Sequence, residues 1–255
     1  MSAEVYDVSP GVARVSWSAD LQERGLKAAA GAVTEAVESA FKGGVRRVEV
    51  HVDPDDQPAQ RIATFSGLQR EGIARGAHET GDRIVYARIA TDAPLDDPKA
   101  FRSLLNSFLP RKRAISQMLI RDHDGRVLMC GLTYKRDHDL PGGVVEVSES
   151  PQLAVSREVE EELGLRIEAG ELLLTDWLPP WSGWDDAVCL VFDGEVHDAE
   201  IADDIVKQAR EIQSAGFETV AEIRESAADF TARRIEAALR RTRGEGSAYT
   251  ESGRG

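Results

Sequence analysis

The chain has 255 residues, of which 42% are hydrophobic and 30% are charged, as in ordinary soluble globular proteins. Its formal net charge of −14 argues against nucleic acid as a partner, because a phosphate backbone requires a basic surface. No apolar run of about 18 residues occurs, and the acidic N-terminus is unlike a secretion signal. We therefore expect a cytoplasmic location and no membrane partner.

The first part of the chain, residues 1–91, is predicted to be a mixed α/β unit. Its expected elements are a strand in GVARVSWS (11–18), an alanine-rich amphipathic helix in GLKAAAGAVTEAVESAFK (25–42), and alternating strands in VRRVEVHV (45–52) and DRIVYARIA (82–90).

A polar, proline-marked stretch over residues 92–112 is interpreted as a linker or bridging helix. Its middle, AFRSLLNSFL, lies between Pro98 and Pro110, which fits a short helix. The basic run from Arg111 to Arg113 is too short to outweigh the acidic chain, so it is interpreted as a solvated flank.

The second part, residues 113–248, is also predicted to mix strands and helices. RAISQMLIRD (113–122) and RVLMCGLTY (126–134) flank the turn signal DHDG, strands return at 169–178 and 185–196, and helices are expected from Ser150, over 205–213 and over 229–241. Residues 249–255 are predicted to be a tail, frayed from Gly244 onward. Both cysteines, Cys130 and Cys189, lie in apolar runs typical of a core.

The segment REVEEELG, Arg157–Gly164, carries four glutamates in five positions. Like charges three and four residues apart on a helix repel one another, so solvent, basic neighbours or a cation should compensate. Ser150 is a natural N-cap and Pro151 a natural first helical residue. A helix that begins there places an apolar stripe toward a core, formed by Val155, Val159 and Leu163.

Three of these glutamates fall together on a different face of the helix. Glu158, Glu161 and Glu162 stand at i, i+3 and i+4, so their carboxylates are predicted to converge where one cation can touch them. Mg2+ suits such a site because it takes oxygen ligands and keeps waters for exchange with phosphates. A solvated acidic face is the alternative, and Glu160 is interpreted as exposed.

The glutamates belong to a larger pattern, GVVEVSESPQLAVSREVEEELGL, which begins at Gly143. Every fixed position of the Nudix box is filled, by Gly143, Glu149, Arg157, Glu158, Val159, Glu161, Glu162, Gly164 and Leu165. Residues 113–248 therefore resemble a Nudix hydrolase domain, from a family that cleaves nucleoside diphosphates linked to another group. The resemblance implies an α/β/α sandwich built on a mixed sheet.

The resemblance also implies roles for individual residues. Glu158, Glu161 and Glu162 would hold Mg2+, or alternatively Mn2+, with the carbonyl of Gly142 as a further ligand. Arg157 would orient the carboxylates with support from Glu149. The expected general base is Glu158, with Glu161 as the second choice. The reaction would be hydrolysis of a phosphoanhydride in a small nucleotide, such as ADP-ribose, a nucleotide sugar or an ordinary or oxidised nucleoside triphosphate.

Beyond the box, DWLPPWSGWDD presents aromatic side chains that could stack on a nucleobase. Trp181 and Trp184 are candidates for the pocket mouth, whereas Trp177 is assigned to the core. Before the box, Lys135, Arg136 and His138 could contact phosphate. The alternative for all three is a charged, exposed turn.

The front part carries a second resemblance, in VEVHVDPDDQPAQRIATFSGLQREGIARG (48–76). This segment resembles the second half of a GNAT-type acetyltransferase, and Gln22 to Gly25 stand where that family's pyrophosphate-binding turn would fall. Lys27, Asp56 and Leu68 depart from the family pattern, and the first strands and helices of the family are missing. A partial domain that serves as a scaffold, a dimer surface or an effector site is therefore expected.

Three functions compete at this point. The favoured one is a metal-dependent nucleotide hydrolase; the alternatives are an acetyl-CoA-dependent N-acyltransferase and a non-catalytic nucleotide sensor. A sensor would be expected to lose box glutamates, and none is lost here. The sequence leaves open which nucleotide is cut and whether the chain forms a homodimer.

Overall fold

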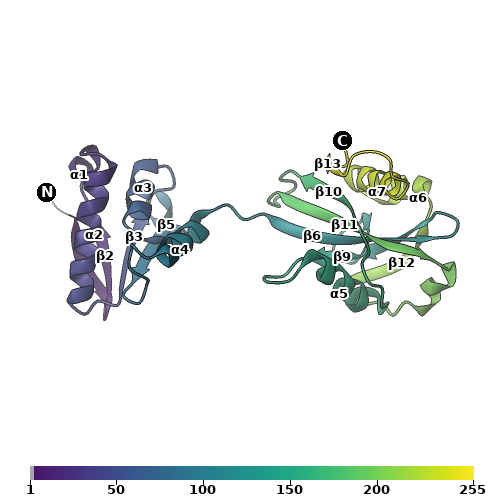
Figure 1. Ribbon diagram of the computed structural model, residues 1–255, viewed down its shortest axis with the longest axis horizontal. Coiled ribbons are helices and arrows are strands. Elements are labelled where there is room, and N and C mark those ends of the chain that lie inside the picture. The colour runs from purple at the N-terminus through teal and green to yellow at the C-terminus, as the bar shows by residue number, and fades with distance from the viewer. Residues whose placement is uncertain (1–2) are drawn as a thin grey trace. The chain divides into compact units, whose positions relative to one another are not determined.

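The computed structural model describes residues 3–255 and divides the chain into two compact units, unit 1 up to Pro110 and unit 2 over Arg111–Gly255 (Figure 1). Within the described residues, none of the helices combines the length and the apolar character needed to cross a membrane.

Unit 1 is a five-stranded sheet with helices. The sheet order is β1-β2-β3-β5-β4, with β2 and β3 parallel and the other neighbours antiparallel. The elements are β1 (Glu4–Ser9), β2 (Val12–Ser16), α1 (Ala19–Glu23), α2 (Leu26–Lys42), β3 (Arg47–Val52), α3 (Gln57–Phe65), β4 (Gln69–His78), β5 (Gly81–Ile89) and α4 (Pro98–Phe108). The expected mixed α/β character and the helix over 25–42 are confirmed.

The core of unit 1 follows from the alternation of its strands. Val48, Val50 and Val52 of β3 are buried, and they pack in one cluster with Val33 and Val37 of α2. The intervening positions of β3 are only partly buried and carry Arg47, Glu49 and His51. One face of this sheet is therefore apolar because every second residue is, as the period of a strand requires.

The predicted linker helix forms as α4 and belongs to unit 1. Asp97 caps its N-terminus by accepting a hydrogen bond from Lys99 N at 2.7 Å, and Pro98 occupies the first turn. The hydroxyl of Ser107 accepts a 3.1 Å hydrogen bond from Arg70 N, which ties α4 to β4. The resemblance of residues 48–76 to GNAT-type acetyltransferases stays a prediction.

Unit 2 is built on an eight-stranded mixed sheet. The strand order is β12-β7-β6-β11-β10-β13, with β8 paired to β7 and β9 to β6; the β6–β11 and β10–β13 pairs are parallel. The elements are β6 (Arg113–Asp122), β7 (Val127–Leu132), β8 (His138–Asp139), β9 (Gly142–Val144), α5 (Pro151–Leu163), β10 (Leu172–Leu178), β11 (Ala187–His197), η1 (Ala199–Asp204), β12 (Ile212–Glu218), α6 (Val220–Ser226), α7 (Asp229–Arg241) and β13 (Tyr249–Glu251).

Helices cover both faces of this sheet, with α5 on one side and α6 and α7 on the other (Figure 1). Successive residues of β6 point to opposite faces. Met118 and Ile120 pack with Val155 and Val159 of α5, whereas Leu119 packs in the cluster that includes residues of α7. The expected α/β/α arrangement on a mixed sheet is present in this unit.

The prediction of a helix over residues 205–213 is wrong. In the structure this segment is an irregular loop that turns into β12 at Ile212. Its backbone instead closes the C-terminal end of α5: Val206 N donates to Leu163 O at 2.8 Å, and Gln208 N donates to Glu162 O at 2.9 Å. These long-range bonds satisfy helix-end carbonyls, so tertiary contact overrides local helical propensity.

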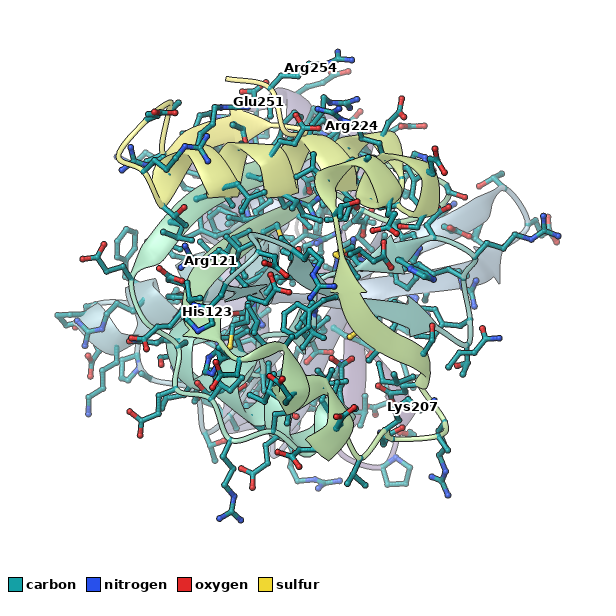
Figure 2. All side chains as sticks on the ribbon, turned by 90° about the vertical axis from the view of Figure 1, so that its right-hand side faces the viewer. Arg121, His123, Lys207, Arg224, Glu251 and Arg254 are labelled. Atoms are coloured by element: carbon teal, nitrogen blue, oxygen red, sulfur yellow. The ribbon has the colours of Figure 1, made fainter. Side chains whose placement is uncertain are left out.

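The prediction that the chain is frayed from Gly244 onward is also wrong. Residues Tyr249–Glu251 form β13, which pairs in parallel with β10. The hydroxyl of Thr250 and the amide of Gly253 both donate to Asp176 Oδ1, at 2.7 and 2.8 Å. Glu251 and Arg254 lie next to α7 at the C-terminal end of the chain (Figure 2). A buried carboxylate in β10 thus orders the end of the chain.

Candidate active site

The acidic helix α5 begins and ends as its sequence predicts. Ser150 Oγ accepts a 3.3 Å hydrogen bond from Leu153 N, and Pro151 occupies the first turn. Gly164 ends the helix at φ 70°, a left-handed conformation that favours glycine. Val155, Val159 and Leu163 are buried, and Glu162 is buried beside them with 5% of its surface exposed. A carboxylate therefore sits at the edge of a core face.

Two glycines allow β9 to lie against the acidic face of α5. Gly142 has φ +135°, and a Cβ on it would lie 2.2 Å from Ser116 O. Its amide donates a 3.0 Å hydrogen bond to Glu162 Oε2. A Cβ on Gly143 would lie 2.6 Å from the carboxyl carbon of Glu158. The Gly-Gly pair is thus needed because backbone and carboxylates are in direct contact.

Arg157 gathers three carboxylates around one guanidinium. It binds Glu149 in a bidentate pair, with Nε–Oε1 at 2.9 Å and Nη2–Oε2 at 3.0 Å. Its Nη1 lies 3.0 Å from both Glu158 Oε1 and Glu161 Oε2. The hydrogen bonds from Arg157 lower the pKa of Glu149. A planar guanidinium fixes the positions of the carboxylate oxygens that it binds, and the orienting role expected of Arg157 and Glu149 stays a prediction.

The two inner glutamates are electrostatically different from Glu149. Burial first, and then the negative charges of Glu158 and Glu211, raise the pKa of Glu162 to about 7 in total, against the hydrogen bond from Gly142. Burial also raises the pKa of Glu158, against the charge of Arg157. Both carboxylates are therefore held where the ionised form is disfavoured, which is the condition that a nearby cation would relieve.

The predicted convergence of all three box carboxylates on one point is not formed. Within residues 3–255, no group of three His, Cys, Asp or Glu side chains is arranged to hold a metal ion. Glu161 is 56% exposed and turned toward Arg157. Glu160 binds Arg166 at the surface, at 2.8 Å, as an exposed residue should. The donor set nevertheless suits a hard cation, because the partly desolvated carboxylates of Glu158 and Glu162 lie one turn apart on α5 and repel each other electrostatically.

Glu211 is a residue of this site that the sequence did not reveal. It precedes β12 in the loop that closes the end of α5, and its charge acts on both Glu158 and Glu162. The local sequence gives no sign that Glu211 belongs to the site, because its pattern predicts a helix over residues 205–213. Long-range hydrogen bonds hold this loop in place: Val206 and Gln208 bond to α5, and the carbonyl of Glu211 itself accepts from Thr133 N at 2.9 Å.

A cavity of about 420 Å³ adjoins β9, with Gly142 and Gly143 in its wall. Trp181 and Trp184 line it and are 56% and 61% exposed, as expected for a pocket mouth. Trp181 meets Phe230 edge to face with ring centroids 5.5 Å apart. The guanidinium of Arg113 lies 4.7 Å from the ring centroid of Trp184. By contrast, Trp177 is half-buried, and its indole N–H donates to Asp186.

The wall of this cavity also carries a fixed polar network. Asp139 Oδ1 accepts from Gln117 Nε2 at 2.7 Å, and Oδ2 accepts from Lys135 Nζ at 2.7 Å. Gln117 Oε1 in turn accepts from Arg234 Nη1 at 3.0 Å. Burial would raise the pKa of Asp139, but the charges of Lys135 and Arg234 outweigh it and lower the pKa. The cavity therefore offers an ionised acceptor beside an ammonium donor.

The structure separates two of the three candidate residues before the box from this cavity. Arg136 and His138 line a second hollow, together with Tyr134, Lys135 and Gln213. His138 Nδ1 pairs with Glu218 Oε1 at 2.5 Å. Only Lys135 and Tyr134 among the charged or aromatic residues of this turn reach both hollows.

Comparison with known proteins agrees with the box. The NUDIX domain family model matches residues 110–240. A MutT-like protein from Streptomyces ambofaciens is 41% identical over 59 residues, which cover 23% of this chain and only 38% of that relative.

Solved structures that are similar to this chain include the MutT protein of Methanosarcina mazei Go1. It is 23% identical, and the match has a TM-score of 0.44 and covers 55% of this chain and 100% of the Methanosarcina protein. A UDP-X diphosphatase is 18% identical, with a TM-score of 0.47 over 60% of this chain and 75% of the other. The family model spans just over half of the 255 residues, and the box it contains is complete and assembled on α5 and β9. The chain belongs to the Nudix family.

Proposed function

We propose that the protein is a divalent-cation-dependent hydrolase that cleaves a phosphoanhydride bond in a small nucleotide. The observation that carries the proposal is the packing of Glu158 and Glu162 against Gly142 and Gly143, at the wall of an aromatic cavity. This geometry places partly desolvated carboxylates, which suit Mg2+ or Mn2+, beside a hollow large enough to admit part of a nucleotide.

Hydrolysis of a phosphoanhydride requires that the negative charge of its oxygens be neutralised. Phosphoanhydrides resist attack because their oxygens repel nucleophiles, and a bound cation would neutralise these oxygens and acidify water. Glu158 and Glu162 are the residues that would hold it, with the Gly142 carbonyl and Glu161 as further candidate ligands. Arg157 keeps Glu149, Glu158 and Glu161 in position.

Proton transfer needs a carboxylate that is not fully committed to the cation. Glu158 remains our first choice as general base, because burial raises its pKa toward the range in which a base works near neutral pH. Glu161 is the second choice because it is more exposed and paired with Arg157. Glu211 joins them as a candidate, since its charge acts on both inner glutamates.

The cavity supports a nucleoside as the non-phosphate part of the substrate. Trp181, Trp184 and Phe230 offer aromatic surface for a base, and Asp139 beside Lys135 offers an acceptor and a donor. ADP-ribose, a nucleotide sugar and an ordinary or oxidised nucleoside triphosphate all carry a base linked to a phosphoanhydride. We therefore propose a nucleoside di- or triphosphate derivative without choosing among these.

The test is hydrolysis of these compounds with Mg2+ or Mn2+, with products identified by mass spectrometry. Glu162→Gln should reduce turnover by at least about a hundredfold, whereas Glu160→Gln, two residues away but exposed and paired with Arg166, should keep the wild-type rate. Cleavage by Glu162→Gln at the wild-type rate, or no cleavage of any compound by the wild type, would overturn the proposal.

A further inference from the structure

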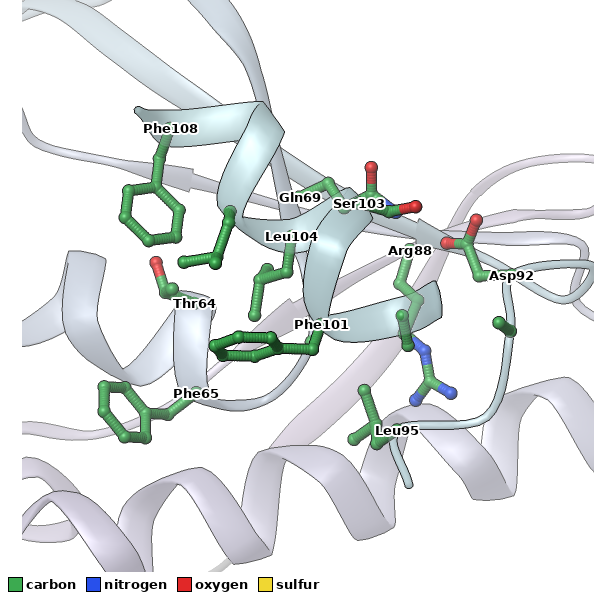
Figure 3. Close-up of a pocket in the computed structure, with 14 residues that line it drawn as sticks. Thr64, Phe65, Gln69, Arg88, Asp92, Leu95, Phe101, Ser103, Leu104 and Phe108 are labelled. Carbon is green, nitrogen blue, oxygen red and sulfur yellow. The ribbon is translucent and has the colours of Figure 1, made fainter. Parts of the chain in front are cut away.

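Unit 1 contains a cavity of about 370 Å³ that the proposed hydrolysis does not use. It lies between α3, α4 and β5, in the range of volumes found for small-molecule sites (Figure 3). Its apolar wall is formed by Phe65, Leu95, Phe101, Leu104, Leu105 and Phe108. The side chain of Leu95 packs over Gly67, where a Cβ would lie 2.3 Å from it.

The apolar wall is incompletely covered. Phe65 is 64% exposed, Phe101 61%, Leu95 41% and Phe108 37%. None of the residues of α4 is buried, although the apolar side chains of this helix point toward the cavity (Figure 3). Large apolar side chains gathered on one surface usually mark a binding site. A ligand with an apolar body would cover them.

A buried cation gives the site its polarity. Arg88 of β5 lines the cavity and is only 5% exposed. Its Nη1 lies 2.7 Å from Oε1 of Glu38, and the ring centroid of Phe41 is 5.7 Å from its guanidinium carbon. Its Nε is buried and has no acceptor within residues 3–255. Buried guanidinium groups normally have all their donors satisfied.

Pairing differs among the arginines of this protein: Arg234, only 2% exposed, also pairs with a single carboxylate, that of Asp176, and its Nη2 is also buried without an acceptor within residues 3–255. Arg47 and Arg157 are 27% and 29% exposed, and each pairs with two or more carboxylates. Arg88 is more deeply buried and pairs with one, through one nitrogen. Asp92 also lines the cavity, but its Oδ2 accepts from Ile89 N at 2.9 Å in a local turn. Arg88 thus has an unpaired guanidinium donor, at Nε, in a residue that lines the cavity.

We propose that this cavity binds a small carboxylate with an apolar body, of the medium-chain fatty-acid class. The carboxylate pairs with Arg88, and the chain lies along Phe101, Leu104 and Phe108. Charge complementarity selects the head group, because guanidinium and carboxylate match in geometry. Burial of the exposed aromatic wall supplies the remaining affinity. The site is separate from the acidic helix, so it does not depend on the proposed hydrolysis.

The proposal is tested by isothermal titration calorimetry of the full chain with decanoate, with decanamide as the uncharged analogue. The wild type should bind one decanoate and should bind decanamide about tenfold to a hundredfold more weakly, as expected when a charge-assisted hydrogen bond is lost. Arg88→Met should lower the decanoate affinity by a similar factor and leave the decanamide affinity unchanged. Arg75→Met, at an exposed position outside the cavity, is the matched control.

A second variant tests the apolar wall without disturbing a buried group. Phe101→Ser, at a 61% exposed position, should keep the wild-type circular dichroism spectrum and weaken both ligands. Equal affinity for decanoate and decanamide, or no binding of either to the wild type, would overturn the proposal. So would sedimentation showing a dimer that Phe101→Ser dissociates and that decanoate leaves intact, since a second copy would then be the occupant.

Discussion

The backbone amide of Gly142 donates a 3.0 Å hydrogen bond to Oε2 of Glu162. This bond joins β9 to α5, two elements separated in the chain by residues 145–150. It stabilises the ionised carboxylate, yet burial and the charges of Glu158 and Glu211 still raise the pKa of Glu162 to about 7. The site is therefore assembled at a cost in stability that a cation would offset.

Glu162→Gln should stabilise the protein in the presence of a chelator. The folded-state pKa of about 7 lies above the ordinary 4.5, so the folded state binds the proton more tightly than the unfolded chain does. The side chain's contribution to the free energy of unfolding therefore decreases as pH rises from about 4.5 to 7, and the penalty is complete above pH 7.

We expect the variant to gain roughly 1 to 3 kcal/mol at pH 8 and little at pH 4. Guanidinium denaturation, followed by tryptophan fluorescence at both pH values, measures the difference. A gain of the same size at pH 4 and pH 8 would contradict the prediction, because it would not come from the ionised carboxylate.

Arg157→Lys should keep the charge but lose the bidentate contact with Glu149. A lysine offers a single ammonium in place of the planar fork that holds Glu149, Glu158 and Glu161. We expect kcat to fall about 10- to 100-fold and the Mg2+ concentration for half-maximal activity to rise. Steady-state kinetics over a magnesium series gives both values; unchanged kcat and magnesium dependence would remove Arg157 from the positioning role.

Gly143→Ala should displace Glu158 without straining the backbone. The added Cβ would lie 2.6 Å from the Glu158 carboxyl carbon, and Gly143 does not have a positive φ. Activity should fall at least about tenfold while the melting temperature changes little. Gly216→Ala in β12, where a Cβ meets no atom within 4 Å, is the control. Equal activity of the two variants would show that the close approach is not required.

Trp184→Ala should weaken substrate binding with little effect on the chemical step. The indole lines the cavity mouth and is 61% exposed, so its loss should leave the fold intact. Removal of a stacking surface should raise KM about 5- to 100-fold at nearly constant kcat. Trp184→Phe should restore most of the affinity, and a failure of phenylalanine to rescue it would argue against stacking.

Thr250→Val should destabilise unit 2 by about 1 to 3 kcal/mol. Its hydroxyl donates to the fully buried Asp176, which also pairs with Arg234 at 2.8 Å. Tyr249→Phe, which removes an exposed hydroxyl bonded to Glu251, should change stability little. Urea denaturation compares the two; equal midpoints would mean that β13 does not stabilise the unit.

The sequence by itself determined the features that depend on local spacing. Ser150, Pro151 and Gly164 set the bounds of α5, and the 3.6-residue period separates Val155 and Val159 from the glutamates. The box therefore identified the family and most of its candidate residues. Period-two alternation likewise predicted β3, because one of its faces is buried, and the turn signal DHDG predicted the hairpin of β6 and β7.

Only the tertiary structure decided which residues distant in the chain join the box residues and the predicted strands. Glu211 reaches the acidic face because Val206 and Gln208 close the end of α5, which turns a predicted helix into a loop. Likewise β13 is held by β10, which pairs with it and whose buried Asp176 binds Thr250 and Gly253, and a lone strand of that length has no local reason to be ordered. These contacts join residues far apart in the chain, and local propensity carries no information about partners that arrive from elsewhere in the fold.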